Sequence, residues 1–470
     1  MLCTAVVAIA RPLAADVLSV HPENPLYFTD GSGKAIYLGG HQIFVDLQDN
    51  SFNKEFIRNK ERTLDWNSYL GFLKAHEFNY LRNWVIWSTG SGAMAPINRA
   101  IAFPMPYKRV RGYGKAVDGK DKFDLLQFDE MFFQRMRERC EDLQRCGIYV
   151  SIMLFEVYGF LNGEACGNPK QTLWDGNVFN KQNNINGIHV DYDGNGNGIE
   201  FFYTQDKRIL QLQKEYVRKV IDTVNHLDNV FYEIANELES PKWQYDLIDF
   251  IKRYEKTKAK QHLILMSAGG RTSSGGWKQM GREVVVDSPA DCFAVAGSWQ
   301  SGRYKRKDPP VNTSGKPGIV DMDHVAPGSH DVEFIWSAFT RGYHFNLYDK
   351  PFESPEAEGP EWECIRHNVK KTIEYAKKMD LVNVSPMANL ASTGFCLAKP
   401  GHQYVVYQPE KALFTVSALK GGTVYYYEFY DTKERRIVSS GHLSPSSSKE
   451  TFFPPTKGTV LFLTSLLDSN

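Results

Sequence analysis

Short apolar runs alternate with longer amphipathic stretches from Lys34 to about Leu381. Eight of the runs have the length and composition of buried strands: 35–39, 79–86, 148–155, 229–235, 262–267, 292–296, 317–323 and 343–348. Helical patterns lie between them at 66–76, 128–145, 209–227, 243–256, 332–340 and 363–379. This alternation predicts an α/β fold, a closed (β/α)8 TIM barrel of parallel strands. An open doubly wound sheet is the alternative, and the absence of a glycine-rich phosphate loop before any helix disfavours it.

The pattern changes after about Ser385. Shorter alternating runs, separated by Gly, Pro and Ser, follow at 404–407, 413–416, 423–430, 436–438, 448–453 and 459–464. They predict a small antiparallel β-sandwich. We therefore expect a barrel at 17–385 and an accessory sandwich domain at 386–470. Residues 21–33 contain two turn sequences and are expected to form a hairpin that closes the bottom of the barrel.

Residues 1–16 contain a short apolar run followed by small residues, like the second half of a secretory signal, but lack its basic start. This segment predicts a partial signal peptide and a secreted or periplasmic protein. No other run reaches the roughly 18 apolar residues that span a membrane. The seven cysteines show no zinc-binding spacing, and a disulfide such as one involving Cys140 and Cys146 is left open.

Composition narrows the function classes. The hydrophobic content of 42% and charged content of 23% are those of an ordinary globular protein. A formal net charge of +0 gives no indication of a surface that binds nucleic acid. Aromatic residues reach 13%, and flat rings cover the apolar faces of sugars, so a carbohydrate partner is indicated. A tyrosine-rich β core explains part of the same excess, and the oligomeric state is left open.

The ends of the predicted strands are rich in polar side chains. The fourth strand ends abruptly in Asn236-Glu237, and the seventh ends in Asp321-Met322-Asp323. In a parallel barrel, the carboxyl ends of the strands form the rim that carries the chemistry. The residues that we expect to contact a ligand there are Asn236, Arg82, Trp84, His41, Trp299, Glu156, His324 and Tyr348.

Glu237 and a strand-seven aspartate have the placement that glycoside hydrolysis requires. That reaction needs two carboxyl groups on opposite sides of the glycosidic bond. Strands four and seven stand across the barrel from one another. Asp321 and Asp323 share one face of their strand, because side chains alternate. Asp323 is nearer the rim, so it is the preferred partner of Glu237.

These residues also resemble a known family. The chain resembles the (β/α)8 glycoside hydrolases of clan A, whose acid/base is the Glu of an Asn-Glu pair that ends strand four. More narrowly, it is similar to bacterial cellulase-like glycosidases with a C-terminal domain named for collagen binding. The similarity includes the segments 21–34, 183–187 and 336–342.

The resemblance implies roles for individual residues. Glu237 would be the general acid/base, Asn236 would bind the sugar 2-hydroxyl, and Arg82 would hold the nucleophile ionised. Strand seven departs from the clan, which has Glu where this chain offers Asp321 and Asp323. Aspartate is one methylene shorter. Retention through a covalent intermediate is preferred, and inversion through a water in the wider gap stays open.

Structural roles remain open for several of these residues. Arg82 can equally be a buried ion-pair partner, and Glu156 can cap a loop. His41 and Tyr348 can be structural, and Asp321 and Asp323 can form a hydrogen-bonded group with His324. Trp84 and Trp299 are stacking platforms or core residues. A carbohydrate-binding or adhesion protein on a barrel that has lost catalysis is therefore the alternative to a glycosidase.

The segment 191–198 alternates oxygen-bearing side chains with glycines. Asp191, Asp193, Asn195 and Asn197 resemble a calcium loop, although the EF-hand pattern fails because its twelfth position falls on Phe202. A plain glycine-rich turn is the alternative. Calcium bound here would brace the connection between the third and fourth strands and take no part in the reaction. No cofactor is expected to be required.

Overall fold

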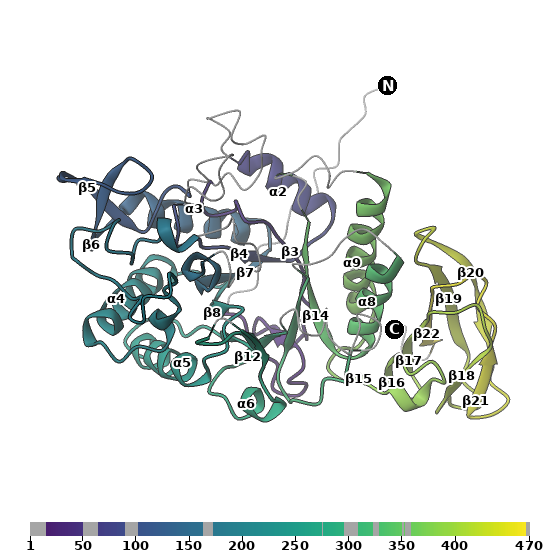
Figure 1. Ribbon diagram of the computed structural model, residues 1–470. Coiled ribbons are helices and arrows are strands. Elements are labelled where there is room, and N and C mark those ends of the chain that lie inside the picture. The colour runs from purple at the N-terminus through teal and green to yellow at the C-terminus, as the bar shows by residue number, and fades with distance from the viewer. Residues whose placement is uncertain are drawn as a thin grey trace, which may run out of the picture.

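A computed structural model describes residues 16–49, 64–89, 102–162, 173–274, 276–295, 309–322, 329–349, 352 and 359–466. Its centre is a closed barrel of eight strands in the order β12-β13-β14-β3-β4-β7-β8-β9, with every neighbouring pair parallel (Figure 1). In chain order the strands are β3 (Gly39–Gln42), β4 (Tyr80–Asn83), β7 (Tyr149–Glu156), β8 (Val230–Asn236), β9 (Ile264–Ser267), β12 (Cys292–Val295), β13 (Gly318–Met322) and β14 (Tyr343–Tyr348). The predicted (β/α)8 barrel is confirmed.

The first strand is the one that the sequence placed wrongly. It was expected at 35–39, but β3 begins only at Gly39. Ile36 instead exchanges backbone hydrogen bonds with Phe28, at 2.7 and 3.2 Å, and so belongs to the bottom of the barrel. Two consecutive glycines then open the strand, and a Cβ at Gly40 would run into the Tyr80 ring of the neighbouring strand.

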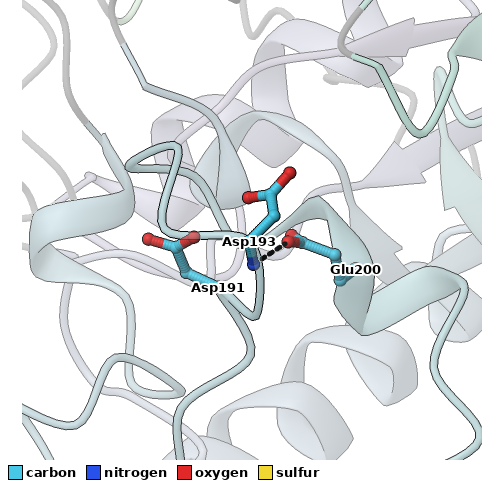
Figure 2. A group of neighbouring side chains, drawn as sticks. All are labelled: Asp191, Asp193 and Glu200. Atoms are coloured by element: carbon cyan, nitrogen blue, oxygen red, sulfur yellow. Dashed lines mark hydrogen bonds between the residues drawn. The ribbon is translucent and has the colours of Figure 1, made fainter.

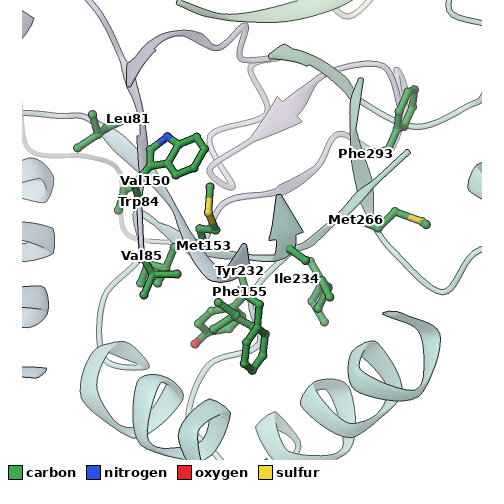
Figure 3. Close-up of a cluster of buried hydrophobic side chains, with 14 of the residues drawn as sticks. Leu81, Trp84, Val85, Val150, Met153, Phe155, Tyr232, Ile234, Met266 and Phe293 are labelled. Atoms are coloured by element: carbon green, nitrogen blue, oxygen red, sulfur yellow. The ribbon is translucent and has the colours of Figure 1, made fainter. Parts of the chain in front are cut away.

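The connecting helices lie close to their predicted positions. They are α2 (Trp66–Ala75), α3 (Glu130–Arg145), α4 (Lys207–Val224), α5 (Pro241–Glu255), α8 (Ser329–Thr340) and α9 (Pro360–Lys378). The short helix α6 (Arg282–Val286) was not predicted. Asp65, Asp129 and Asp206 cap three of them by accepting backbone N–H groups at 2.8–3.0 Å. Short 3-10 turns add Tyr158–Phe160, Leu173–Gly176, Ile199–Phe202 and Ala388–Leu390. Figure 3 shows Phe155, Tyr232 and Ile234 on the side of the barrel wall that faces the helices.

The bottom of the barrel is closed as expected. The short strands β1 (Ser19–Val20) and β2 (Phe28–Thr29) pair antiparallel. The Phe28 ring lies 6.4 Å from that of Phe231, inside the barrel. Both rings belong to a buried apolar cluster that includes Tyr80, Leu265 and Ile319. This cluster fills the end of the barrel at which the strands begin.

Two antiparallel hairpins extend the connections at the opposite end. The first, β5 (Tyr107–Lys115) and β6 (Asp121–Phe128), lies between β4 and α3 and projects from the barrel (Figure 1). The second, β10 (Gly269–Arg271) and β11 (Trp277–Gln279), follows β9. Neither hairpin was predicted. In the first, charged residues and glycines conceal the alternation of apolar and polar positions, and the strands of the second are very short.

The C-terminal region is antiparallel, as predicted. One sheet contains β15 (Ser385–Pro386), β16 (Cys396–Lys399), β17 (Gln403–Gln408), β22 (Thr459–Ser465), β19 (Tyr425–Asp431) and β20 (Arg436–Leu443), in that order. The other pairs β18 (Phe414–Ser417) with β21 (Lys449–Phe452). Both contribute to one apolar core, so the region is a sandwich. It packs on α8 and α9, where Tyr375 stacks on Phe462 at 5.2 Å (Figure 1). The boundary at 385/386 stays a prediction.

Two further expectations concern chain chemistry. Cys140 and Cys146 are both free, so they do not form the disulfide that the sequence left open. None of the helices in the described ranges is long and apolar enough to cross a membrane. Residues 1–15 of the expected signal segment lie outside the described residues, so that expectation stays a prediction.

Candidate active site at the carboxyl ends of the barrel strands

A buried ion pair lies inside the barrel, one layer above the apolar bottom. The Arg82 side chain on β4 donates from Nε to Glu233 Oε2 on β8 at 2.8 Å, and its Nη2 pairs with Glu233 Oε1. The two side chains are 3% and 0% exposed, so both charges are removed from water. The structure thus shows Arg82 as the buried ion-pair partner of Glu233, which is one of the two roles that the sequence left open.

A glutamine that the sequence did not single out ties three strands together. Gln42 Oε1 on β3 accepts hydrogen bonds from Arg82 Nη1 at 3.0 Å, Trp84 Nε1 at 3.1 Å and Asn346 Nδ2 at 2.9 Å. Asn346 lies on β14, and all of these side chains are buried. This network fixes the orientation of Arg82 and of the Trp84 indole at the mouth of the barrel.

The Asn236 side chain is aligned by the same arginine. Arg82 Nη2 donates to Asn236 Oδ1 at 2.7 Å. The Asn236 residue is 1% exposed, and its Nδ2 donor has no acceptor among the described residues. Because its oxygen already accepts from the arginine, the amide presents an N–H donor beside Glu237.

Glu237 follows directly after β8 in an unusual backbone conformation. Its φ is 51°, in the left-handed region, which costs a non-glycine residue roughly 1 kcal/mol. The turn is held by the second hairpin: Arg271 N–H donates to Glu237 O at 2.8 Å, and Glu239 N–H donates to Arg271 O at 3.0 Å. Gly270 runs so close that a Cβ there would collide with the Glu237 carbonyl. Neighbouring strands therefore fix Glu237, which is 1% exposed.

Aromatic rings surround this end of the barrel. The Phe44 ring lies 4.3 Å from Trp84 and 4.5 Å from Tyr348, and the Arg82 guanidinium sits over Trp84 at 5.1 Å. Trp84 and Tyr348 are thus brought together at the mouth, as expected of rim residues. Trp277, on β11, is 37% exposed.

His41 occupies a different place from the one that the sequence suggested. It lies between the barrel wall and α2, fully buried, with hydrogen bonds of 2.7 Å to Tyr69 Oη and to Asp349 Oδ1. Asp349 also accepts from Arg366 Nε at 2.6 Å. Burial alone would raise the pKa of Asp349, but the facing His41 and Arg366 hold it below its ordinary value. His41 therefore links β3 to its helices, and its neighbour Gln42 faces the interior.

Glu156, at the end of β7, caps the loop that follows it. Its two carboxyl oxygens accept backbone N–H groups of Trp87 at 3.1 Å and Gly159 at 2.8 Å. Burial raises the pKa of Glu156 to about 7 despite these hydrogen bonds. Among the two roles proposed from sequence, the geometry matches loop capping.

The seventh strand is described only in part. Asp321 lies on β13, in register with Asn346 on β14. Asp323, His324 and Trp299 lie outside the described residues, so their roles stay predictions. In the barrel order, β13 is three strands from β8 along the shorter path, which places the two strands across the barrel from each other.

The calcium-like segment brings three carboxylates together outside the barrel. Asp191, Asp193 and Glu200 each offer an oxygen within 4.8 Å of the others (Figure 2). Burial and the charge of Asp193 raise the pKa of Glu200. The expected ligand oxygens of Asn195 and Asn197 instead accept backbone N–H groups at 3.0 and 3.1 Å. Glu200, which the sequence interpretation omitted, takes their place in the cluster. Calcium binding here stays a prediction.

Comparisons with known proteins agree with the fold. A family described as a domain of unknown function, DUF6298, matches residues 99–274, which include β5 to β8 and Glu237. Comparison with curated proteins gives no match. One similar solved structure is described as a glycoside hydrolase, with 13% identity, a TM-score of 0.59 and a match covering 97% of this chain and 98% of the other.

A second similar structure is a glycoside hydrolase family 5 protein from Bacteroides vulgatus ATCC 8482. It is 12% identical with a TM-score of 0.58, and the match covers 95% of this chain and 93% of the other. At these identities the likeness shows the fold alone. The expected resemblance to (β/α)8 glycoside hydrolases is therefore confirmed as a fold, and the collagen-binding label of the C-terminal domain stays a prediction.

Proposed function

We propose that this protein is a glycoside hydrolase whose general acid/base is Glu237. The observation that carries the proposal is the construction around that residue. Its carboxylate follows a buried strand at the catalytic end of a (β/α)8 barrel, in a backbone conformation fixed by Gly270 and Arg271. Such locked, costly geometry is typical of functional sites.

The neighbouring residues suit sugar recognition. The Asn236 amide, oriented by Arg82, offers an N–H donor that fits a ring hydroxyl beside the scissile bond. Trp84, held by Gln42 and 5% exposed, adds an aromatic ring to the mouth of the barrel, and aromatic rings suit the apolar faces of sugars. The substrate is accordingly an oligosaccharide or polysaccharide.

The second carboxylate in this proposal comes from β13, with Asp323 preferred over Asp321. In the retaining version it attacks the anomeric carbon while Glu237 protonates the leaving oxygen. Water, deprotonated by Glu237, then releases the sugar. In the inverting version the aspartate activates water directly. We prefer the retaining route. It requires the two carboxyl groups to lie about 5 Å apart, and the shorter aspartate side chain makes a wider gap, and so inversion, the alternative.

The test is incubation of the full chain with a panel of neutral and acidic glycans, with the products followed by NMR. We expect hydrolysis of at least one glycan, and the anomer first released assigns retention or inversion. Glu237→Gln should bind that glycan and fail to turn it over. Glu239→Gln is the matched control, since Glu239 lies two residues after Glu237 in the same connection and its carboxylate pairs with Lys278 at 2.9 Å.

Equal activity of Glu237→Gln and the wild type would refute the assignment. Binding without hydrolysis across the whole panel would favour the alternative, a carbohydrate-binding protein on a barrel that has lost catalysis. The N-terminal segment adds a separate proposal, export to the periplasm or medium, which N-terminal sequencing of the protein from its native host would check.

A further inference from the structure

The β5–β6 hairpin, residues 107–128, has features that the proposed chemistry does not use. It lies in the connection from β4 to α3, so it arises at the same end of the barrel as Glu237. Figure 1 shows it projecting beyond the helices that surround the barrel. A long projection at the catalytic end is well placed to contact a polymeric substrate at a distance from the cleaved bond.

The inner strand of the hairpin, β6, and the turn before it are firmly anchored. Phe123 donates its N–H to Asn183 O at 2.8 Å and accepts at its carbonyl from Ile185 N–H at 2.9 Å. Leu125 N–H donates to Asn186 Oδ1 at 2.7 Å, and Val117 N–H donates to Asn183 Oδ1 at 3.0 Å. The 183–186 segment thus pairs with β6 and leaves β5 as the outer strand.

The outer strand carries an extrusion that displays two side chains. Val110 pairs with Lys122 and Lys115 pairs with Asp121, so residues 111–114 have no partners across the ladder. Gly112 and Gly114 have φ values of 91° and 84°, a conformation that favours glycine. Between them, Tyr113 is 62% exposed, and Arg111 beside it is exposed as well.

The charge of the hairpin differs from that of the chain as a whole. Residues 107–128 contain six basic and three acidic residues, a net charge of +3, whereas the complete chain has +0. Arg109 pairs with Asp118, and Lys115 pairs with Asp121 at 2.6 Å. Asp124 accepts instead from Asn186 at 2.9 Å. Lys108, Arg111 and Lys122 form no ion pair with any described residue, which leaves an excess of positive charge on the hairpin that carries Tyr113.

We propose that this hairpin binds an anionic glycan, with Tyr113 stacked on a sugar ring and Arg111 paired with a carboxylate. An exposed tyrosine supplies the apolar face that a pyranose needs, and guanidinium binds carboxylate through two parallel hydrogen bonds. The inference rests on the proposed glycosidase function and extends it. The substrate class becomes a polysaccharide that contains acidic sugars.

The test measures binding to the full-length Glu237→Gln protein, so that turnover does not interfere. Isothermal calorimetry would compare polygalacturonate with the same polymer after methyl esterification, which removes the charge and keeps the sugar backbone. We expect binding of the acidic polymer, weakened about 10-fold or more by Tyr113→Ala or Arg111→Ala and by raising the salt. Arg436→Ala, which removes an exposed arginine from the C-terminal sheet, is the matched control and should bind as well as the parent.

A sulfated glycan forms the third arm, because sulfate offers the same negative charge without carboxylate. If the sulfated polymer binds more tightly than the carboxylate polymer, and Arg111→Ala abolishes that binding, the hairpin is still the binding site and its ligand is a sulfate ester. Equal affinity for esterified and acidic polymer, no binding of either charged polymer, or unchanged affinity in both hairpin variants would overturn the inference. These outcomes are independent of whether Glu237 proves catalytic, since none of them is a measurement of hydrolysis.

Discussion

The two ends of the barrel interior are equally buried but chemically opposite. Phe231 and Glu233 are neighbours on the inward face of β8, and both are 0% exposed. Phe231 packs with Phe28 and Tyr80 at the end where the strands begin. Two residues further along, Glu233 is held by Arg82 in a network of charges and amides. The inward face of β8 therefore changes from apolar packing to polar contacts between one inward-facing residue and the next.

The difference separates what folds the barrel from what the barrel does. Apolar burial at the bottom stabilises the fold directly. The polar network at the mouth costs desolvation that its hydrogen bonds only offset, and a well-packed apolar replacement is often as stable. The polar network at the carboxyl ends of the strands therefore serves the geometry of Asn236 and Trp84 more than the stability of the fold.

The largest effect on stability is expected from breaking that network on one side only. Arg82→Met leaves Glu233 charged and buried without its partner, which should lower the free energy of unfolding by about 3–5 kcal/mol. The double variant Arg82→Met/Glu233→Met should recover most of this loss. Chemical denaturation would measure the free energy of unfolding of both variants. Both should be inactive, because Arg82 no longer aligns Asn236. A single variant that loses less than about 1 kcal/mol would show that the pair is less isolated than its burial indicates.

A smaller effect should appear in the pH dependence of stability. Burial raises the pKa of Glu156 to about 7 from an ordinary value of 4.5. Between those pH values the folded protein keeps a proton that the unfolded chain has lost, so stability falls as the pH rises. The total is about 3 kcal/mol, at roughly 1.4 kcal/mol per pH unit, and the contribution is constant above about pH 7.5.

Glu156→Gln removes this titration. Denaturation curves at several pH values should therefore show a flatter profile for the variant than for the wild type between pH 4.5 and 7. Parallel profiles would mean that Glu156 is ionised in the folded protein across this range.

The smallest effect is expected at the bottom of the barrel. Phe231→Leu leaves a modest cavity and should lower the free energy of unfolding by about 1–2 kcal/mol. The kcat, calculated per folded molecule, and the KM should both stay within about twofold of the wild type. The substitution is confined to the apolar bottom of the barrel. A tenfold loss of kcat without further loss of stability would abolish the separation between the two ends.

The sequence predicted the barrel well, since seven of its strands are apolar runs long enough to recognise. It failed where the pattern is shortest. Gly39-Gly40 carries no strand signal, so the first strand was placed too early and its facing was not fixed. A shift of one residue exchanges the two faces of a strand. For this reason His41 was expected at the ligand and Gln42 was overlooked.

Other features depend on contacts that no local pattern reveals. Gln42 and Asn346 are ordinary amides until the barrel brings them to Arg82. The left-handed turn at Glu237 depends on Gly270, more than 30 residues further along the chain. The Asn-Glu pair itself was recognisable because it ends an apolar strand abruptly, at the end where a parallel barrel carries its chemistry.

The most direct test of the account compares leaving groups in the Glu237→Gln protein. A general acid matters most when the leaving oxygen is strongly basic, and positioned proton transfer contributes about 10²–10⁴-fold. We predict a loss of kcat/KM of at least about 100-fold on the natural glycan and a much smaller loss on an aryl glycoside with an acidic phenol. Equal losses on both substrates, or no loss on either, would contradict the assignment of Glu237 as the proton donor.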